Sequence, residues 1–538
     1  MKLKSLLFIM SLGLCSSAMA DDAQLQREIQ LLQQQTQALQ TQLNHLQKKM
    51  VAQSAHSEGS GHPALKKSAT PRKEERHAVK KIAKHKIKPL HPESSVHSSP
   101  VTVHSLNEHP ESVEFNPAAL IADGHVVTYI SGMPVVTSPF LGSLPAFDGS
   151  DYIVNISSIN RDVRLMQQRR SLYQAYERMG YPRPNLPIVA ISGKAEPAGS
   201  WHQSNVANAS GDWTLGSSEF DVAAAVNDKV EAYLALAYDE GPPSIGGPRV
   251  GNSAVNLNMG FVNIGDLDES PFYFTAGQLY VPFGRFSTAM VSAPLTMRMA
   301  RTKARPFILG YKSQQSSGPF AAVYAYKGET TLGSSGVGGL NLGYTINTGS
   351  ALGEVGASVI SSLNDVAGIQ KTGSPAGTTF GGFASPTNGS ENVYKVPGVG
   401  VHGAINIDRY SLTAEWVSSV GRYHPEDLSF NGLGAQLQAG QLEGGVTFMF
   451  FDRPASIGVG YQWSKDTLAL NLPQQRINGV FNISIWKDTV ESLEYRHDID
   501  YGRYQFANGA APAGMVNANT LGTGGFSDTL LAQIGVYF

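Results

Sequence analysis

The sequence has almost no cysteine and no long apolar run. Cys15 is the only cysteine, and it lies in a short apolar stretch near the amino terminus. A single thiol excludes an internal disulfide and any metal site built from several cysteines. No window approaches the roughly 20 consecutive apolar residues that a membrane-spanning helix needs. The fold must therefore be held together by burial and backbone pairing alone.

The amino terminus has the parts of an export signal in the right order. A basic start is followed by apolar residues 6–14 and by the small-residue pattern Ala-Met-Ala at 18–20. This order predicts a secretory signal peptide over residues 1–20. Leu14 stands before Cys15 where a lipidation signal needs a small residue, so we do not expect a lipoprotein.

Residues 21–50 have apolar side chains at alternating spacings of four and three. The positions are Leu25, Ile29, Leu32, Leu39, Leu43, Leu46 and Met50, with Thr36 in the same register. This heptad pattern predicts an α-helical coiled coil, because a lone helix of this length is marginal in water. We expect a homo-oligomer formed through residues 25–50. The alternative is a single helix on the periplasmic rim of the protein.

Residues 51–110 form a basic linker rich in His, Pro and Ser. The segment has ten Lys or Arg against five Asp or Glu, and eight of the 14 histidines. Such a composition predicts a disordered, solvated tether. Contact with peptidoglycan or weak capture of metal is the functional alternative.

Residues 111–187 combine short β-like runs with one helical stretch. Asn160 is a candidate N-cap, and Gly180 followed by Pro182 is a stop signal. The helix is rich in arginine, and it predicts either a small plug inside a lumen or a periplasmic collar.

Residues 188–538 show a period of two. Two representative strands alternate apolar with small or polar residues over 230–239 and 455–464, and the last strand alternates up to the terminal Phe538. This is the lipid and lumen alternation of a membrane barrel, and a terminal aromatic residue is the usual outer-membrane assembly signal. At roughly 20–25 residues per strand and connection, about 16 strands are expected. The fold class is all-β: a transmembrane antiparallel β-barrel preceded by a periplasmic coiled coil and linker.

The charge of the barrel portion excludes some partners. Residues 111–538 contain 26 basic and 35 acidic residues. We therefore expect no nucleic-acid partner. Acidic outer loops suit contact with lipid and lipopolysaccharide through divalent cations. The localisation we predict is the bacterial outer membrane, with the amino-terminal region in the periplasm.

Several long stretches together resemble the LbtU-type siderophore porins of Legionella and its relatives. They are residues 128–142, 158–170, 271–287, 295–311, 468–476 and 491–501. The resemblance covers most of residues 112–538. It implies a receptor that admits a ferric siderophore without the TonB energy transducer. The sequence agrees, because no TonB box follows the signal peptide and residues 111–187 are short for a folded plug domain.

An anionic ferric siderophore needs cations in a confined lumen, since a focused field raises the local ligand concentration. Arg301, Lys303 and Arg305 share one parity, and Arg298 precedes them. A strand with this pattern would point these residues at the lumen. Arg496 belongs to a second, mixed-sign row with Glu494, Asp498 and Asp500. The alternative for both rows is a ladder of charges that stiffens the wall.

No enzyme, cofactor or resident metal is predicted. His402 with Asn406 lacks the nearby serine of an outer-membrane phospholipase, and Asp498 with Asp500 is a weak candidate for a hard cation. The predicted function is siderophore uptake. A general diffusion porin, or a structural anchor tied to the cell wall by its amino-terminal stalk, is the alternative.

Overall fold

The computed structural model covers the whole chain. It describes residues 126–130, 133–137, 141, 147–148, 153–154, 161–178, 187–239, 254–328, 336–366, 369, 379–380, 383–384, 394–425, 427–486, 488–508 and 521–538. All of these belong to one compact unit, residues 89–538. The predicted signal peptide, coiled coil and linker lie outside the described residues.

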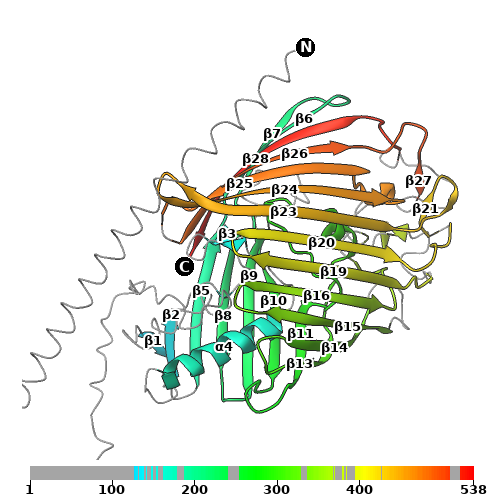
Figure 1. Ribbon diagram of the computed structural model, residues 1–538. Helices are drawn as coiled ribbons and strands as arrows, with labels where there is room; N and C mark the ends of the chain where they lie inside the picture. The colour runs from blue at the N-terminus through cyan, green and yellow to red at the C-terminus, as the bar shows by residue number, and fades with distance from the viewer. Residues whose placement is uncertain are drawn as a thin grey trace, which may run out of the picture. The chain divides into compact units, whose positions relative to one another are not determined.

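The strands of the barrel wall follow one another around it in chain order (Figure 1). They are β5 (Ile188–Ala195), β6 (Ala198–Ser204), β7 (Ser210–Thr214), β8 (Glu219–Ala225), β9 (Val230–Asp239), β10 (Ala254–Ile264), β11 (Phe272–Tyr280), β13 (Phe307–Lys312), β14 (Gly318–Lys327), β15 (Gly336–Asn347), β16 (Ala351–Ile360), β19 (Gly398–Ile407), β20 (Tyr410–Ser419), β23 (Gln438–Phe450), β24 (Arg453–Lys465), β25 (Gln475–Ile483), β26 (Thr489–Ile499) and β28 (Phe526–Tyr537).

Shorter elements lie between or beside them. They are β1 (Val126–Ile130), β2 (Met133–Thr137), β3 (Phe147–Asp148), β4 (Ile153–Val154), α4 (Arg161–Arg178), α5 (Leu295–Ala300), β12 (Lys303–Ala304), β17 (Thr379–Phe380), β18 (Phe383–Ala384), β21 (Ser429–Phe430), β22 (Leu433–Gly434), the 3-10 turn η3 (Leu468–Leu470) and β27 (Ala507–Asn508). The helix predicted between Asn160 and Gly180 is confirmed as α4. Within the described residues, no helix is both long enough and apolar enough to cross a membrane.

Two pairs of short strands each act as one bent strand. Pro197 separates β5 from β6, since proline cannot donate to a strand ladder. Gly216, at φ +63°, lies between β7 and β8. Counted this way, the described strands form a closed antiparallel barrel of 16, the predicted number.

The barrel closes between its last strand and its first. β28 pairs with β6 over seven positions and with β5 only at Val536 and Tyr537. The terminal Phe538 completes this seam, because its N–H donates to the Gly193 carbonyl at 2.9 Å and its carbonyl accepts from the Gly193 N–H at 2.5 Å. Just beyond Phe538, β2 pairs in parallel with the start of β5. The last residue is thus part of the wall.

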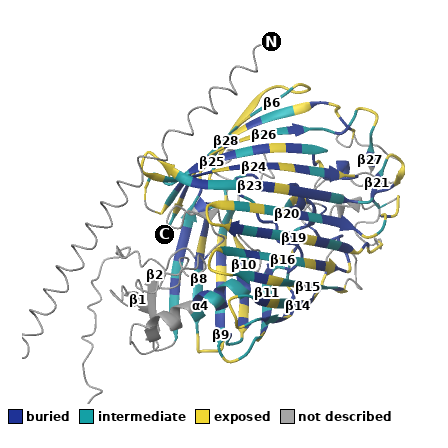
Figure 2. Cartoon of the chain, in the orientation of Figure 1, coloured by how far each residue is buried: buried dark blue, intermediate teal, exposed yellow. Residues whose placement is uncertain are grey.

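The predicted two-residue alternation is confirmed. On β9, Leu234 and Leu236 are 49% and 40% exposed, whereas Tyr233 and Ala235, which alternate with them, are almost fully buried. Figure 2 shows the same alternation of exposed and buried residues along neighbouring strands. In water this apolar outer face would be unfavourable, whereas hydrocarbon matches it. The barrel therefore has the exterior of a membrane-spanning wall.

The two ends of the barrel differ in the length of their connections. At one end, two-residue turns such as Phe451–Asp452 join consecutive strands, and both residues have positive φ. At the other end the connections are longer, including residues 281–306, 361–397 and 500–525. Short periplasmic turns and long outer loops are the arrangement of outer-membrane barrels.

Candidate functional site

The connection between β11 and β13, residues 281–306, reaches across to the inner wall of other strands. We call it the constriction loop. Its backbone contacts side chains on β16, β20, β24 and β26, which lie far around the barrel from β11. The loop therefore narrows the lumen rather than extending away from it.

Three wall carboxylates hold the backbone of the constriction loop. Glu415 on β20 accepts the N–H groups of Arg285 at 2.7 Å and Phe286 at 2.9 Å. Glu443 on β23 accepts the Ala289 N–H at 3.0 Å, and Glu494 on β26 accepts the Ser292 N–H at 2.8 Å. All three carboxylates are almost fully buried.

This arrangement has a simple physical cause. A segment without regular secondary structure must find partners for its backbone N–H groups, and buried N–H groups are costly when unpaired. Carboxylates on the inward parity of the strands supply them, with the Gln462 side-chain oxygen accepting the Leu295 N–H at 2.9 Å. As a result, much of the negative charge on this wall faces the loop backbone and not the open lumen.

The constriction loop itself is purely basic. Residues 281–306 contain Arg285, Arg298, Arg301, Lys303 and Arg305, and no Asp or Glu. Arg285 pairs with Glu354 on β16 at 2.5 Å. Within the described part of the chain, the exposed Arg298 guanidinium forms no hydrogen bond or ion pair.

Arg298 lies near a cluster on β25 and β26. Arg476 binds Asp498 through two hydrogen bonds, 2.6 and 3.1 Å long, and Arg496 pairs with the same carboxylate at 3.0 Å. Enclosure by the wall and the positive charges of Arg476 and Arg496 lower the pKa of Arg298, whereas Asp498 raises it. An arginine stays protonated regardless. The guanidinium groups of Arg298, Arg476 and Arg496 therefore lie near two carboxylates, those of Asp498 and Glu494. The Glu494 carboxylate also accepts the Ser292 N–H of the loop.

The structure shortens the strand predicted for Arg301, Lys303 and Arg305 to β12, Lys303–Ala304. Arg298, which precedes this row, lies on the helix α5, residues 295–300. Proline at position 294 precedes that helix, and its side chains Leu295 and Met299 are buried in the lumen packing. A helix places residues three apart on one face, whereas strand parity pairs residues two apart.

The remaining basic residues of the loop lie against β10 and β11. Arg301 stacks on the Tyr280 ring with its guanidinium carbon 4.4 Å from the centroid, and the Lys303 ammonium is 5.2 Å from it. Lys303 also donates to the Asn258 side-chain oxygen at 2.5 Å. Arg305 is exposed and donates to Gln278 at 3.3 Å. The predicted basic residues therefore form two groups, Arg298 with Arg496 and Arg301 with Lys303 and Arg305.

The first turns of α4 lie against the inner wall at the short-turn end. Arg161 donates to Glu219 on β8 at 2.9 Å and lies 3.7 Å from Asp221. Arg169 lies 3.4 Å from Glu231 and donates to the Gly265 carbonyl at 2.7 Å. Burial raises the pKa of Asp162, which accepts the Thr275 hydroxyl from β11 at 3.1 Å.

A chain of polar contacts joins α4 to the constriction loop. Glu219 binds Arg161 with one carboxylate oxygen and the Asn258 amide with the other, at 2.6 Å. Asn258 in turn accepts from Lys303. The plug-like helix and the constriction loop thus share wall partners.

Sequence reasoning missed the residues that position the loop. Glu415, Glu443 and Arg476 were not proposed, although each has the lumen-facing parity of its strand. For the two glutamates, the available signal was an acidic residue at an inward-facing position of its strand. His402 faces Glu354 at 3.4 Å. Among described residues there is no group of three or more His, Cys, Asp or Glu placed to hold a metal.

Removing the Arg476 side chain is expected to destabilise the barrel. An Arg476→Ala variant leaves the buried Asp498 carboxylate with Arg496 as its remaining ion-pair partner. The cost should therefore lie below the roughly 3–5 kcal/mol of a buried charge left fully unpaired. The midpoint of denaturant unfolding in detergent measures the loss, and a variant as stable as the parent would contradict the assignment.

Relatives of the chain are found by sequence, although no family model matches it. The UPF0422 protein lpg2959 of Legionella pneumophila strain Philadelphia 1 is 67% identical over 448 residues, which cover 83% of this chain and 84% of the relative. The chain belongs to the UPF0422 family. The UPF0422 protein of Coxiella burnetii is more distant, at 34% identity over 406 residues that cover 74% of this chain and 83% of the relative.

Solved structures similar to this UPF0422 chain include two outer-membrane channels. The DcaP channel of Acinetobacter baumannii has a TM-score of 0.42 at 14% identity and covers 65% of this chain and 97% of its own. The anion-selective porin from Comamonas acidovorans has a TM-score of 0.43 at 11% identity and covers 66% and 100%.

Proposed function

We propose that this protein is an outer-membrane porin that admits an anionic iron chelate, a ferric siderophore, through a positively charged constriction. The observation that carries the proposal is the constriction loop, residues 281–306. It has five basic and no acidic side chains, and it lies inside a closed 16-stranded barrel.

The acids of the wall are turned toward the loop backbone. Glu415, Glu443 and Glu494 keep their charge but accept hydrogen bonds from the loop, whereas the exposed charges of the loop are the basic groups of Arg298, Lys303 and Arg305. Inside a low-dielectric wall such charges focus the field and concentrate anions. Guanidinium groups also bind carboxylates through two parallel hydrogen bonds. A polycarboxylate chelate suits both properties.

The choice of a siderophore as cargo rests on the resemblance of the sequence to LbtU-type porins. Transport without an energy transducer is part of the same proposal. So are the periplasmic placement of the amino-terminal region, its homo-oligomerisation through residues 25–50, and its contact with peptidoglycan through residues 51–110. Ligand contacts are assigned to Arg298, Arg301, Lys303, Arg305 and Arg496.

Reversing the charge at Arg298 should reverse the ion preference of the pore. At an effective dielectric constant of about 20, one charge about 10 Å away changes the energy of an ion by about 1.7 kcal/mol before salt screening. We expect Arg298→Glu to reduce the anion-to-cation permeability ratio on the order of tenfold, measured as a reversal potential in planar bilayers. The control is Arg409→Glu, because Arg409 is an exposed residue in the turn between β19 and β20. An equal change in both variants would refute a role for the constriction.

Uptake in cells tests the cargo. Deletion of the gene should abolish growth on iron supplied as the ferric siderophore, while growth on an iron salt continues. In bilayers the ferric siderophore should block the current, whereas the iron-free form should block it less. A pore open to all small solutes and not blocked would identify a general diffusion porin. A barrel without conductance would favour an anchoring role.

A further inference from the structure

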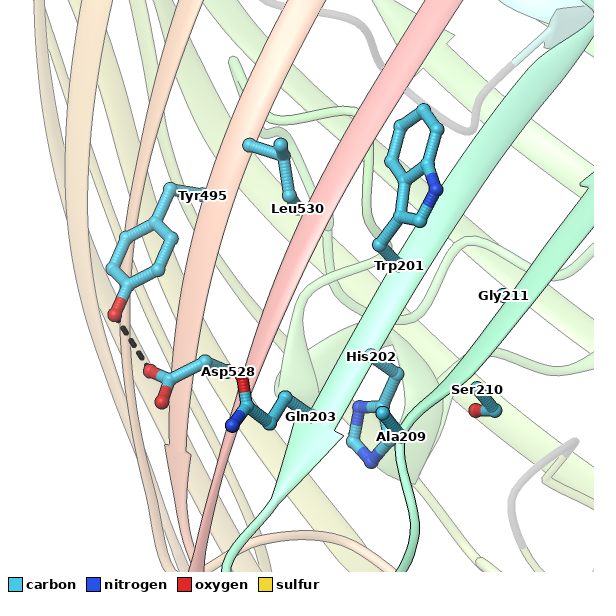
Figure 3. Close-up of a pocket in the computed structure, with 9 residues that line it drawn as sticks. All are labelled: Trp201, His202, Gln203, Ala209, Ser210, Gly211, Tyr495, Asp528 and Leu530. Atoms are coloured by element: carbon cyan, nitrogen blue, oxygen red, sulfur yellow. Dashed lines mark hydrogen bonds between the residues drawn. The ribbon is translucent and has the colours of Figure 1, made fainter.

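A cleft lies on the outer face of the barrel, where β26, β28, β6 and β7 run side by side (Figure 3). Its volume is about 410 Å³. Trp201, Tyr495 and Leu530 line it, and each is between 41% and 51% exposed. These residues have the lipid-facing parity of their strands, whereas His202 and Ser210, which also line the cleft, have the opposite parity. The aromatic and apolar side of the cleft therefore faces the membrane.

The strand register arranges the residues around the cleft in three rows. Tyr495, Leu530, Trp201 and Gly211 are direct neighbours in the middle row. The row toward the short-turn end is Leu493, Ala532, Gly199 and Trp213. Ala532, Gly199 and Gly211 are small, so the neighbouring tryptophan rings can lie close to the wall. The ring of Trp213 covers Gly199 so closely that a Cβ there would lie 2.8 Å from it.

The third row, toward the long-loop end, is polar: His497, Asp528 and Gln203. The Asp528 carboxylate accepts the Tyr495 hydroxyl at 2.6 Å and lies 2.8 Å from the His497 ring nitrogen (Figure 3 shows the first of these contacts). A charged residue on the lipid side is tolerated near the headgroups and not at the bilayer centre. Asp528 therefore places the upper edge of the cleft at the outer headgroup level.

We propose that this cleft binds a glycolipid of the outer leaflet, with a sugar ring in the cleft and an acyl chain on the wall beneath it. Trp201 and Tyr495 offer flat apolar faces with a polar edge, the surface on which a sugar ring packs. Asp528 and Gln203 provide hydrogen-bond acceptors for its hydroxyl groups. Leu530, Ala532 and Ile534 continue down β28 as a track for the acyl chain.

The charge of the site fits the sugar part of a glycolipid. The Asp528 carboxylate accepts hydrogen bonds from neutral hydroxyl groups and repels a phosphate placed directly against it, so the phosphates of lipopolysaccharide must lie away from Asp528. The concave surface between Trp201 and Tyr495 also suits a small headgroup better than a flat protein interface. Neither argument depends on the cargo of the pore, so this proposal stands or falls independently of the proposed transport.

Native mass spectrometry of the full-length protein, extracted from outer membranes in mild detergent, tests the site. Lipopolysaccharide should remain bound to the parent protein. Trp201→Ala and Asp528→Ala should each reduce the bound fraction on the order of tenfold, the equivalent of about 1.4 kcal/mol. Trp201→Phe, which keeps a flat ring, should retain most of it.

Two controls separate the outcomes. Tyr461→Ala removes an outward aromatic residue on β24, away from the cleft, and should leave binding unchanged. A shift of electrophoretic mobility on heating shows that each variant is folded. The proposal would be overturned if Tyr461→Ala lost as much lipopolysaccharide as the cleft variants, or if both cleft variants kept it. It would also be overturned if the cleft variants lost a protein oligomer while lipopolysaccharide stayed bound.

Discussion

Single-channel conductance should rise about two-fold or more when the constriction loop is released from the wall. The variant is the triple change Glu415→Ala, Glu443→Ala and Glu494→Ala. Each carboxylate makes at least one hydrogen bond to the loop backbone, and bonds to a charged group are worth roughly 1.5–3 kcal/mol each. With all three removed, the loop loses its charged backbone anchors and keeps the bonds to Ser358 and Gln462, so the lumen should widen.

The anion selectivity of the triple variant should change in the opposite direction from the one expected for a simple loss of negative charge. Removing three acids would ordinarily make a pore more selective for anions. Here Arg298 leaves the passage together with the loop, so anion selectivity should fall while conductance rises.

The matched control is Glu491→Ala on β26, which removes a carboxylate of outward parity beside the turn. It should leave both properties unchanged. A triple variant with parental conductance and sharper anion selectivity would show that the loop does not depend on these carboxylates.

Replacing Arg161 should detach α4 from the inner wall. Arg161→Ala leaves Glu219 and Asp221 without their buried cation, and breaking such a pair costs about 3–5 kcal/mol. The cost is concentrated in the docking of the helix, because the wall itself keeps its backbone ladder. Amide hydrogen exchange in residues 161–170 should accelerate on the order of a hundredfold or more.

The position of α4 also predicts a change in permeation. A detached helix no longer obstructs the short-turn end, so conductance should increase there as well. Gln167→Ala is the control, because Gln167 lies on the same helix and is only half-buried. Exchange that stays slow in Arg161→Ala would place the main anchor of α4 elsewhere, for example at Arg169.

Predictions from the sequence succeeded where the residue pattern is local and repeats. The alternation around Leu234 and Leu236 defines both the strand and its lipid face, since successive side chains point to opposite sides. The cap and stop signals around residues 160–180 gave the bounds of α4. In both cases the chain needs only its near neighbours to determine the outcome.

Predictions failed where the partner of a residue is far away in the sequence. The row of Arg301, Lys303 and Arg305 has strand parity, yet only Lys303 and Ala304 form a strand, and the loop before them is held by carboxylates from β20, β23 and β26. Glu494 was correctly placed on the inner face of its strand, but its partner, Ser292, is 202 positions away.

The sequence by itself determined the class of the molecule: a barrel whose alternation suits lipid outside and polar groups inside, ending on a strand at Phe538. That is possible because strand parity and the hydrophobic effect act residue by residue. Only the tertiary structure decided that residues 281–306 narrow the lumen, that Arg298 and Arg301 lie against different walls, and that Arg161 holds α4 inside. Each of these depends on wall residues, among them the inner-face carboxylates and the Tyr280 ring, that folding of the barrel brings into contact with the loop and the helix, and no local pattern shows those contacts.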